Sequence, residues 1–592
     1  MKNIPELVRQ VQEHLRAGRA AQARPLLMRA LPGASGADAG VLCQSMSHVA
    51  MAEKLTDQAL YYAQRAITLA PRDAEGYVNL ANIHWALGAI PLAIETAADA
   101  VARFPAVRNA HATLLNFYLR EDRFADVMEG CRAAMGIFPG DSQFAATYAT
   151  MLLSVGKPEE AVALLREVTR KEPRNIRGWA ALCPALNYLP SADLKENVEA
   201  HRAYGKLLAE LLPPRQAGKG GGPLDPERPL KIGFVSPDLR THPMRFFIVN
   251  VFEHLDRKSF NISCYFTGGA EDEVSQRFKA LVPSWKHVPS LNIGQLADVI
   301  SRDGVDILID LAGHTRYDRL GTMHLNPAPV QMNYIGYPNT TGIQHMDYHI
   351  TDSLSSPPNQ EPFWTERLLR LDPVFFAYKP MDGPPDITEP PMLKNGYVTF
   401  GSFNTLMKLN DEVIRAWTKI VLGVPGSRLI VKNIQLMQPQ AQQITRERFI
   451  KAGLPADRLE VFGHKGTPFD HLSTYQRIDV GLDTFPYAGM TTTLESLLMG
   501  VPVVSLAQQS HASRVGLSIL AHVELKDLVA ETEEQFIKIA QSLALDGPRL
   551  TSLRSSLRGT LQSSVLCNGA ALGVRFGEGL RGAWREYCKK QS

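Results

Sequence analysis

The stretch GLDTFPYAGMTTTLESLLMGVPVVSL, residues 481–506, decides the fold of the second half of the chain. An apolar lead-in runs into a Pro-Tyr-Ala-Gly turn. Three threonines then open an apolar helical pattern, and Gly-Val-Pro leads into a second apolar run. Strand, turn, helix and strand in this order predict one unit of a parallel α/β sheet, with the turn at the carboxyl end of its first strand.

Three consecutive threonines, Thr491, Thr492 and Thr493, stand where that helix is expected to begin. The first amides of a helix have no partner within it and the helix dipole is positive there, so such ends bind anions. The alternative, plain N-capping, explains one threonine well and three poorly. We therefore predict a pyrophosphate-binding helix start, with Glu495 in the first turn accepting hydrogen bonds from ribose hydroxyls.

The same alternation of apolar runs and helical patterns continues from Leu230 onward. Helical patterns separate short apolar runs, and a proline-rich crossover at 379–392 divides the runs into two groups. The expected strands are 230–236, 260–268, 305–313, 330–338, 397–403, 427–433, 458–463, 478–483 and 501–506. Apolar strands between helices predict two parallel sheets covered on both faces, with a cleft at the carboxyl ends of their strands.

Further candidate residues follow expected strands. Lys408 could neutralise a phosphate leaving group, with a solvated surface lysine as the equal alternative. His242, Asp310 and His314 stand in loops of the first group, where a histidine is a candidate general base, although each alone is more often structural. His471 could contact a nucleoside or only cap a helix. The sequence has no GxxxxGK[ST], short DxD or HExxH motif, which argues against P-loop, metal–nucleotide and zinc-protease sites.

Prolines in the first third of the chain recur every 34 residues, at Pro71, Pro105, Pro139 and Pro173. Small residues keep the same frame where paired helices would cross, at Ala59, Ala93, Val127, Ala161, Ala66, Ala100 and Ala134. This pattern predicts an all-α solenoid of tetratricopeptide repeats over 1–190, with a divergent hairpin at 1–39 and a truncated unit around Trp179. Such a solenoid holds a peptide or partner protein on its concave face or, alternatively, forms a homodimer.

Local composition predicts the remaining domain boundaries. Residues 191–212 read as one more helix, and PPRQAGKGGGPLDPERP (213–229) reads as a linker or loop. We therefore expect repeats at 1–190, a helix and linker at 191–228, and two lobes at 229–385 and 386–592.

Charge and cysteine content exclude several classes of protein. The 592 residues are 45% hydrophobic and carry a formal net charge of +3, without a basic tract, so neither nucleic acid nor a membrane is an expected partner. Six scattered cysteines without a CxxC pair predict reduced thiols rather than a zinc site. No signal peptide and no apolar run of about 18 residues is found, so we expect a cytoplasmic protein.

Several motifs, taken in order after the repeats, resemble the SPINDLY / O-GlcNAc transferase family of protein glycosyltransferases. They are GFVSPDLRTHPM, DLAGHT, PAPVQMNYIGYPNTTGI, MDYHITD, FGSFNTLMKLND, LDTFPYAGMTTTLESLLMGVPVV and HASRVG. The resemblance covers the repeats and everything from Leu230, in a bacterial form without the large domain inserted between the lobes. It implies a GT-B fold of two Rossmann-like lobes. It also implies an inverting transfer, without metal or cofactor, of a sugar from a nucleotide donor to Ser or Thr hydroxyls of an acceptor protein bound along the repeats.

The resemblance also assigns functions to individual residues. By this resemblance His242 is the base, Lys408 binds the diphosphate, and Thr491 and Thr492 bind the phosphates. Glu495 is the ribose-binding carboxylate, and His471 lies beside the nucleoside. The loop expected to line the donor sugar contributes Gly336, Pro338, Thr340, Thr341 and Gly342. Possible further active-site residues are Asp310, His314 and Asn404.

One departure from the family concerns the donor. Met490 stands where animal members have histidine and SPINDLY members usually have threonine, and methionine donates no strong hydrogen bond to a phosphate. UDP-GlcNAc is the expected donor, with GDP-fucose second and another activated sugar, for a flagellin-modifying enzyme, third. The non-enzyme alternative is a repeat scaffold whose transferase half is inactive.

Overall fold

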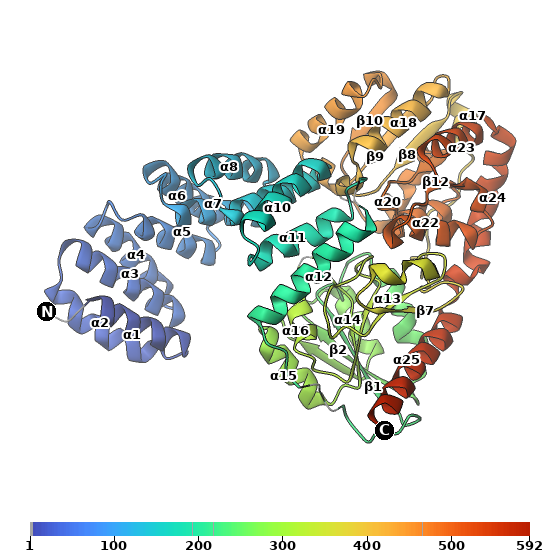
Figure 1. Ribbon diagram of the computed structural model, residues 1–592. Coiled ribbons are helices and arrows are strands. Elements are labelled where there is room, and N and C mark those ends of the chain that lie inside the picture. Colours follow the sequence, from blue (N-terminus) through green and yellow to red (C-terminus); the bar gives the residue numbers. More distant parts are fainter. Residues whose placement is uncertain (1–3, 192, 217, 219, 316, 465) are drawn as a thin grey trace. The chain divides into compact units, whose positions relative to one another are not determined.

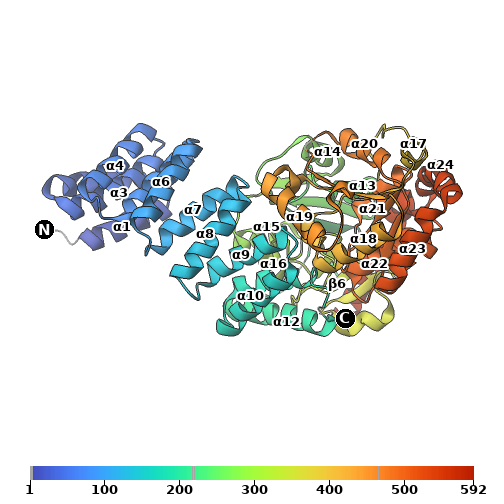
Figure 2. The same cartoon turned by 90° about the horizontal axis from the view of Figure 1, so that it is seen from above.

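The computed structural model describes residues 4–191, 193–216, 218, 220–315, 317–464 and 466–592. The chain divides into two compact units, Met1–Met151 and Leu152–Ser592 (Figure 1). Paired helices make up the first unit (Figure 2). They are α1 (Ile4–Arg16), α2 (Ala20–Ala30), α3 (Gly36–Ala52), α4 (Thr56–Leu69), α5 (Ala74–Ala86), α6 (Ile90–Arg103), α7 (Arg108–Arg120), α8 (Phe124–Ile137) and most of α9 (Ser142–Ser154).

The 34-residue frame is confirmed. Each of the four recurring prolines follows the end of its helix by two residues, after α4, α6, α8 and α10 (Pro158–Lys171). The predicted crossing residues Ala59, Ala93, Val127 and Ala161 are all 0% exposed. Small side chains are required there because the paired helices approach closely. The predicted hairpin before the regular frame is α1 with α2.

The second unit begins with α10, α11 (Ile176–Leu186) and α12 (Leu194–Leu211). The division between compact units therefore falls inside the region predicted as repeats, 1–190. The last of these helices pack with the α/β lobes that follow them in the same unit.

A seven-stranded parallel sheet forms the first lobe, in the order β3-β2-β1-β4-β5-β6-β7. The strands are β1 (Leu230–Ser236), β2 (Phe260–Phe266), β3 (Ser284–His287), β4 (Ile307–Asp310), β5 (Val330–Tyr334), β6 (Tyr348–Thr351) and β7 (Arg367–Arg370). The intervening helices are α13 (Arg245–His254), α14 (Glu273–Leu281), α15 (Ile293–Asp303) and α16 (Leu320–His324). Every residue of β4 and β5 is buried, as expected for apolar strands covered on both faces.

The second lobe holds a six-stranded parallel sheet in the order β10-β9-β8-β11-β12-β13. Its strands are β8 (Thr399–Ser402), β9 (Arg428–Lys432), β10 (Leu459–Phe462), β11 (Val480–Leu482), β12 (Val503–Leu506) and β13 (Val529–Ala530). Its helices are α17 (Pro391–Asn395), α18 (Asp411–Gly423), α19 (Pro439–Lys451), α20 (Pro468–Ser473), α21 (Thr491–Leu498), α22 (His511–Ala521), α23 (Glu533–Leu545) and α24 (Gly547–Ser563). In both lobes the strand order reverses beside the first strand of the lobe, which is the Rossmann arrangement. The two Rossmann-like lobes expected of a GT-B fold are thus confirmed.

The last helix, α25 (Gly569–Gln591), crosses back onto the first lobe (Figure 1). It packs against α13, and its Phe576 ring meets that of Tyr334 in β5 edge-on at 5.1 Å between centroids. The boundary predicted at 386 assigns this helix to the second lobe, and the structure differs there. An amphipathic pattern shows that a helix is half-buried but not which sheet buries it.

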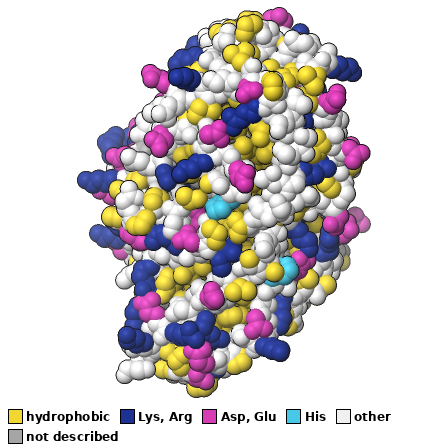
Figure 3. Space-filling model, turned by 90° about the vertical axis from the view of Figure 1, so that its right-hand side faces the viewer, with side chains coloured by type: hydrophobic (Ala, Val, Ile, Leu, Met, Phe, Trp, Pro, Cys, Tyr) yellow, Lys and Arg dark blue, Asp and Glu magenta, His cyan; other side chains and the backbone are white. Residues whose placement is uncertain are grey.

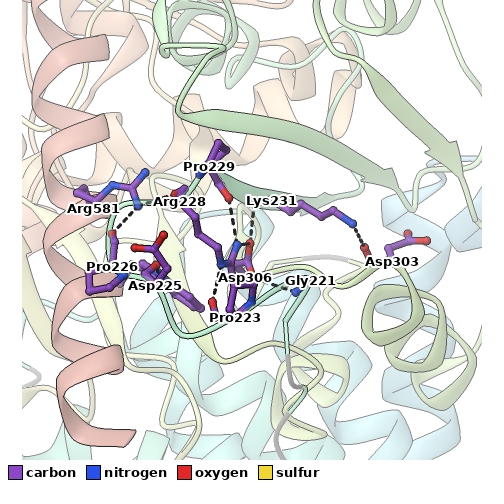
Figure 4. Close-up of polar contacts among 11 residues, drawn as sticks. Gly221, Pro223, Asp225, Pro226, Arg228, Pro229, Lys231, Asp303, Asp306 and Arg581 are labelled. Carbon is purple, nitrogen blue, oxygen red and sulfur yellow. Dashed lines mark hydrogen bonds and ion pairs between the residues drawn. The ribbon is translucent and has the colours of Figure 1, made fainter. Parts of the chain in front are cut away.

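The proline- and glycine-rich segment before β1 is anchored to the first lobe near its end (Figure 4). Asp306, which is 0% exposed, accepts hydrogen bonds from the Arg228 guanidinium at 2.7 and 2.8 Å. It also accepts from the amides of Gly221, at 3.0 Å, and Lys231, at 2.8 Å. From α25, Arg581 donates to the carbonyl of Arg228 at 2.9 Å. Part of the predicted linker is therefore fixed by a buried ion pair.

The distribution of surface charge and the length and polarity of the helices agree with the composition. Acidic and basic side chains are interspersed over the face drawn in Figure 3, in keeping with a net charge of +3. Across the described ranges, no helix has both the length and the apolar character needed to span a membrane.

Candidate active site at the carboxyl ends of the strands

Most of the candidate residues follow strands that meet where the strand order reverses. In the second lobe, Asn404 and Lys408 follow β8, and the threonine helix α21 follows its neighbour β11. In the first lobe, His242 follows β1, and the 310–314 loop follows its neighbour β4. Ligands of open α/β sheets bind outside the carboxyl ends of the strands at this reversal.

The amides at the start of α21 are available to a ligand. Leu494 is the first residue of the helix whose amide bonds back, to Met490 O at 3.1 Å. No described residue accepts a hydrogen bond from the amides of Thr491, Thr492 or Thr493. This leaves three N–H groups and the positive end of the helix dipole directed out of the turn.

The three threonine hydroxyls differ in their surroundings. Thr492 Oγ1 donates to Asn404 Oδ1 at 3.1 Å, which links α21 to the loop after β8. Thr493, 2% exposed, donates to Gly489 O at 3.1 Å and so supports the turn instead. Thr491 is partly buried. The predicted anion site therefore consists of the helix amides with Thr491 and Thr492, because Thr493 bonds back one helical turn.

Asp483, at the end of β11, holds the turn before α21. It is 1% exposed and accepts hydrogen bonds from the Gly489 amide at 2.6 Å and from Ser505 Oγ at 2.7 Å. The sequence prediction missed this residue, although a carboxylate at a strand end before a turn is a recognisable signal. Met490 is partly buried against the apolar core, so its side chain contributes packing there.

Lys408 lies beside this turn. Its Nζ donates to Ala488 O at 2.7 Å and stands 4.0 Å from the centre of the Tyr487 ring. Burial lowers the Lys408 pKa to about 8, and the negative charge of Asp483 opposes that shift. The ammonium group is partly desolvated and contacts Ala488, three residues before α21 begins, so it suits an anion held by the start of that helix.

A pocket opens at the carboxyl ends of β8 and β11. Its lining residues come from these strands and the loops after them, from α21, from the segment before β11 and from β12. They are Gly401, Ser402, Phe403, Asn404, Tyr475, Ile478, Gly481, Leu482, Asp483, Thr492, Thr493, Ser496 and Val503. At its side, His471 Nε2 and Glu495 Oε2 are 3.0 Å apart. The other ring nitrogen of His471 contacts Lys432, a residue that the sequence prediction did not include.

His242 lies in the loop after β1 and is exposed at the surface. Its Nδ1 accepts a hydrogen bond from the Met244 amide at 3.3 Å, and the preceding residue, Thr241, donates its amide to Asp272 at 2.7 Å. Although the residue reaches solvent, the protein around the ring lowers the His242 pKa, and Asp238 opposes this shift. A neutral imidazole at neutral pH is the form that accepts a proton.

Asp310 and His314 are buried and make structural contacts. Asp310, 0% exposed, accepts from the Gly313 amide at 2.6 Å and from Asn333 at 2.9 Å, and burial raises its pKa to about 6. His314, 6% exposed, contacts the Thr341 carbonyl through Nε2 at 2.8 Å, and burial lowers its pKa to about 4. Both residues shape the loops at the end of the sheet.

The loop predicted to line the donor sugar is held from behind. Thr340 and Thr341 are 0% exposed, and both hydroxyls donate to the buried carboxylate of Glu366, that of Thr340 at 2.6 Å. At Gly336 and Gly342 an added Cβ would collide with the backbone of Leu311 and His201, so these glycines permit close packing. Pro338 is the member that reaches a second pocket, whose other lining residues are Leu194, Asn197, Asn339, Gln360, Phe363, Trp364, Ser510 and His511. The hydroxyls of both threonines therefore contact Glu366.

One group of described side chains could hold a metal ion. Ligand atoms of Cys183, His201 and His314 lie within 4.8 Å of one another. Both ring nitrogens of His201 already have partners, however, at 2.7 Å from Asn197 O and 2.7 Å from Tyr337 Oη. This hydrogen-bond network accounts for the cluster.

Comparisons with known proteins agree with this fold. The model of glycosyl transferase family 41 matches residues 223–381 and 390–572. The probable UDP-N-acetylglucosamine–peptide N-acetylglucosaminyltransferase SPINDLY of Arabidopsis thaliana is 39% identical over 413 residues, which cover 68% of this chain and 44% of the relative. The UDP-N-acetylglucosamine–peptide N-acetylglucosaminyltransferase of Caenorhabditis elegans is 25% identical over 454 residues, covering 57% and 39%.

A solved structure extends the similarity to most of the chain. A mutant of the Thermobaculum terrenum O-GlcNAc transferase matches with a TM-score of 0.75 at 29% identity, over 93% of this chain and 98% of that one. The chain spans less than half the length of the curated relatives it matches. Because the family model covers more than half of its residues, the chain belongs to glycosyl transferase family 41.

Proposed function

We propose that this chain is a protein O-glycosyltransferase that moves a sugar from a nucleotide donor to Ser or Thr hydroxyls of acceptor proteins. UDP-GlcNAc is the favoured donor, GDP-fucose is the second candidate and another activated sugar the third. The observation that carries the proposal is the anion site at α21, where three helix amides lack acceptors among the described residues and Lys408 lies beside the same turn. The names of the relatives, all peptide N-acetylglucosaminyltransferases, favour UDP-GlcNAc.

The proposed chemistry is a single inverting displacement. The acceptor hydroxyl attacks the anomeric carbon as the nucleoside diphosphate departs, and negative charge grows on the leaving phosphate. Lys408 and the amides of α21 stabilise that charge, in a reaction that we propose needs no metal. Glu495 accepts from the ribose hydroxyls, and His242 is the candidate to receive the proton of the attacking hydroxyl.

The repeats are proposed to bind the acceptor. A hollow in the first unit is lined by residues from its helices: Gln44, His48, Met51, Glu75, Val78, Asn79, Asn82, Ile83 and Asn109. Amide side chains both donate and accept, so they suit the backbone of an extended peptide whatever its sequence. Binding energy gained at a distance from the chemistry would position the acceptor.

A nucleotide panel tests the proposal. The purified chain should bind UDP more tightly than GDP or CMP if UDP-GlcNAc is the donor, as measured by calorimetry. Tighter binding of GDP would select the fucose donor. Failure of all three nucleotides to bind in the low-millimolar range would overturn the enzyme proposal and favour a repeat scaffold.

Gly489→Ala should weaken binding of the selected nucleoside diphosphate by about tenfold or more, the loss of one hydrogen bond to a charged group. An added Cβ at Gly489 would fall within contact distance of Thr492 Oγ1, Thr493 Oγ1 and Asn404 Oδ1, so the start of α21 must rearrange. Gly559→Ala in α24 is the matched control, because an added Cβ there meets nothing within 4 Å. Equal affinities for the two variants would contradict this account of the turn.

A further inference from the structure

Lys432 is the last residue of β9 and is 2% exposed. Its Nζ lies 2.9 Å from His471 Nδ1, 3.1 Å from His471 O and 3.0 Å from Thr474 Oγ1. The Phe403 ring stands 4.8 Å from the same atom. No carboxylate of a described residue contacts this ammonium group directly. Its burial requires an explanation, because burying an ammonium group is costly.

The contacts of His471 give that explanation. An ammonium group only donates, so Nδ1 of His471 must accept from Lys432, and the ring proton lies on Nε2. Nε2 in turn faces Glu495 Oε2 at 3.0 Å, in the geometry of an N–H donating to a carboxylate. Lys432 thus fixes the tautomer of His471 by donating to Nδ1, and Glu495 accepts the hydrogen bond from Nε2–H.

The two carboxylate oxygens of Glu495 differ in their contacts. Within the described ranges, Glu495 Oε1 accepts no hydrogen bond, while Oε2 is held by His471. Glu495 as a whole is 9% exposed, so the carboxylate has little freedom to turn. Its free oxygen is therefore held in a fixed direction in the first turns of α21.

Among the described residues, the charges of Glu495 and Asp470 act on Lys432. Burial lowers the Lys432 pKa to about 8, and the charges of Glu495, on α21, and Asp470, on α20, oppose this shift. Lys432 is thus an ammonium group at neutral pH and loses its proton as the pH rises through about 8. A neutral amine can accept a hydrogen bond from Nδ1 of His471. The ring can then carry its proton on Nδ1, and Nε2 no longer donates to Glu495.

We propose that Lys432 is a positioning residue for ribose recognition: it fixes the His471 tautomer that donates to Glu495, and so aims the free Glu495 oxygen at the vicinal hydroxyls of the nucleotide. This inference rests on the proposed function. It predicts that Lys432 governs the preference for a nucleotide that carries both ribose hydroxyls, without contacting the nucleotide itself.

The test compares UDP and GDP with their 2′,3′-dideoxy analogues, which keep the base and the diphosphate. The full chain should prefer the natural nucleotide by about tenfold, as expected for hydrogen bonds to a carboxylate. Lys432→Met should bring this ratio close to one, and the ratio in the unmodified chain should fall above pH 8. Lys408→Met is the matched control, since it should weaken both ligands equally and leave the ratio unchanged.

A second variant separates positioning from simple loss of structure. In a Glu495→Gln background, adding Lys432→Met should change the ratio no further, because both act through one oxygen. Lys419→Met, on the exposed face of α18, should match the unmodified chain in every measurement. A Lys432→Met variant that keeps the preference for ribose hydroxyls, or an unmodified chain that shows none, would overturn the inference. Failure of every nucleotide to bind would instead overturn the proposed function.

Discussion

Lys408→Met is expected to lower kcat by about a hundred- to a thousandfold, the usual cost of removing one group that stabilises a developing negative charge. The ammonium group lies beside the turn that ends in the unpaired amides of α21, where the departing diphosphate is proposed to sit. Its charge matters more in the transition state than in the bound donor, so kcat should fall more than the affinity for the donor.

The fold should survive this change. Burial already lowers the Lys408 pKa to about 8, which means that the protein destabilises the charge it holds there. Methionine removes that charge and keeps the aliphatic stem beside the Tyr487 ring. The melting temperature should therefore be unchanged or slightly higher. A variant that unfolds would show that Lys408 is structural, and one that retains full turnover would show that Lys408 does not stabilise the leaving group.

Asp306→Ala is expected to destabilise the second unit by about 3–5 kcal/mol, the cost of breaking a buried ion pair and leaving its partner uncompensated. Four donors from Arg228, Gly221 and Lys231 converge on the two carboxylate oxygens, and the side chain has no contact with water. Removing it leaves the Arg228 guanidinium, whose side chain is 12% exposed, without its partner.

Two measurements check this prediction. The melting temperature of the full chain should fall, and a protease should cut first in the proline- and glycine-rich segment that Asp306 anchors. Asp298→Ala is the control, because it breaks an exposed pair with Arg215 and should cost about 1 kcal/mol or less. Equal melting temperatures for the two variants would mean that the buried pair contributes nothing.

The elements of this fold follow from local patterns where those patterns repeat or are strongly apolar. Four prolines in one 34-residue frame place the repeats, and runs such as VGL in β11 place the central strands. The strands β3 (SWKH) and β7 (RLLR) are not predicted because they are polar and only partly buried at the edges of their sheet. The strand β6 (YHIT) has no apolar run, and β13 has only two residues. The return of α25 to the first lobe depends on long-range packing that no local pattern encodes.

The candidate site shows the same limit. Thr491, Thr492, Glu495 and Lys408 stand in motifs whose position after a strand is visible in the sequence, and the structure brings them to one edge of the second sheet. The residues that hold such side chains in place lie far from them in the sequence. Glu366 reaches back 25 and 26 residues to hold two threonines, and Lys432 contacts a histidine 39 residues later. Neither carries a local signal, because its role exists only once the fold is formed.

Transfer of an intact sugar to protein tests the central proposal most directly. The purified chain would be incubated with UDP-GlcNAc or GDP-fucose, without added metal and with a chelator, together with acceptor proteins from the same source. Intact-mass and peptide mass spectrometry should then find one added sugar on Ser or Thr with the matching donor, and none with Lys408→Met. Donor binding without any protein-linked sugar from either donor would contradict the proposal.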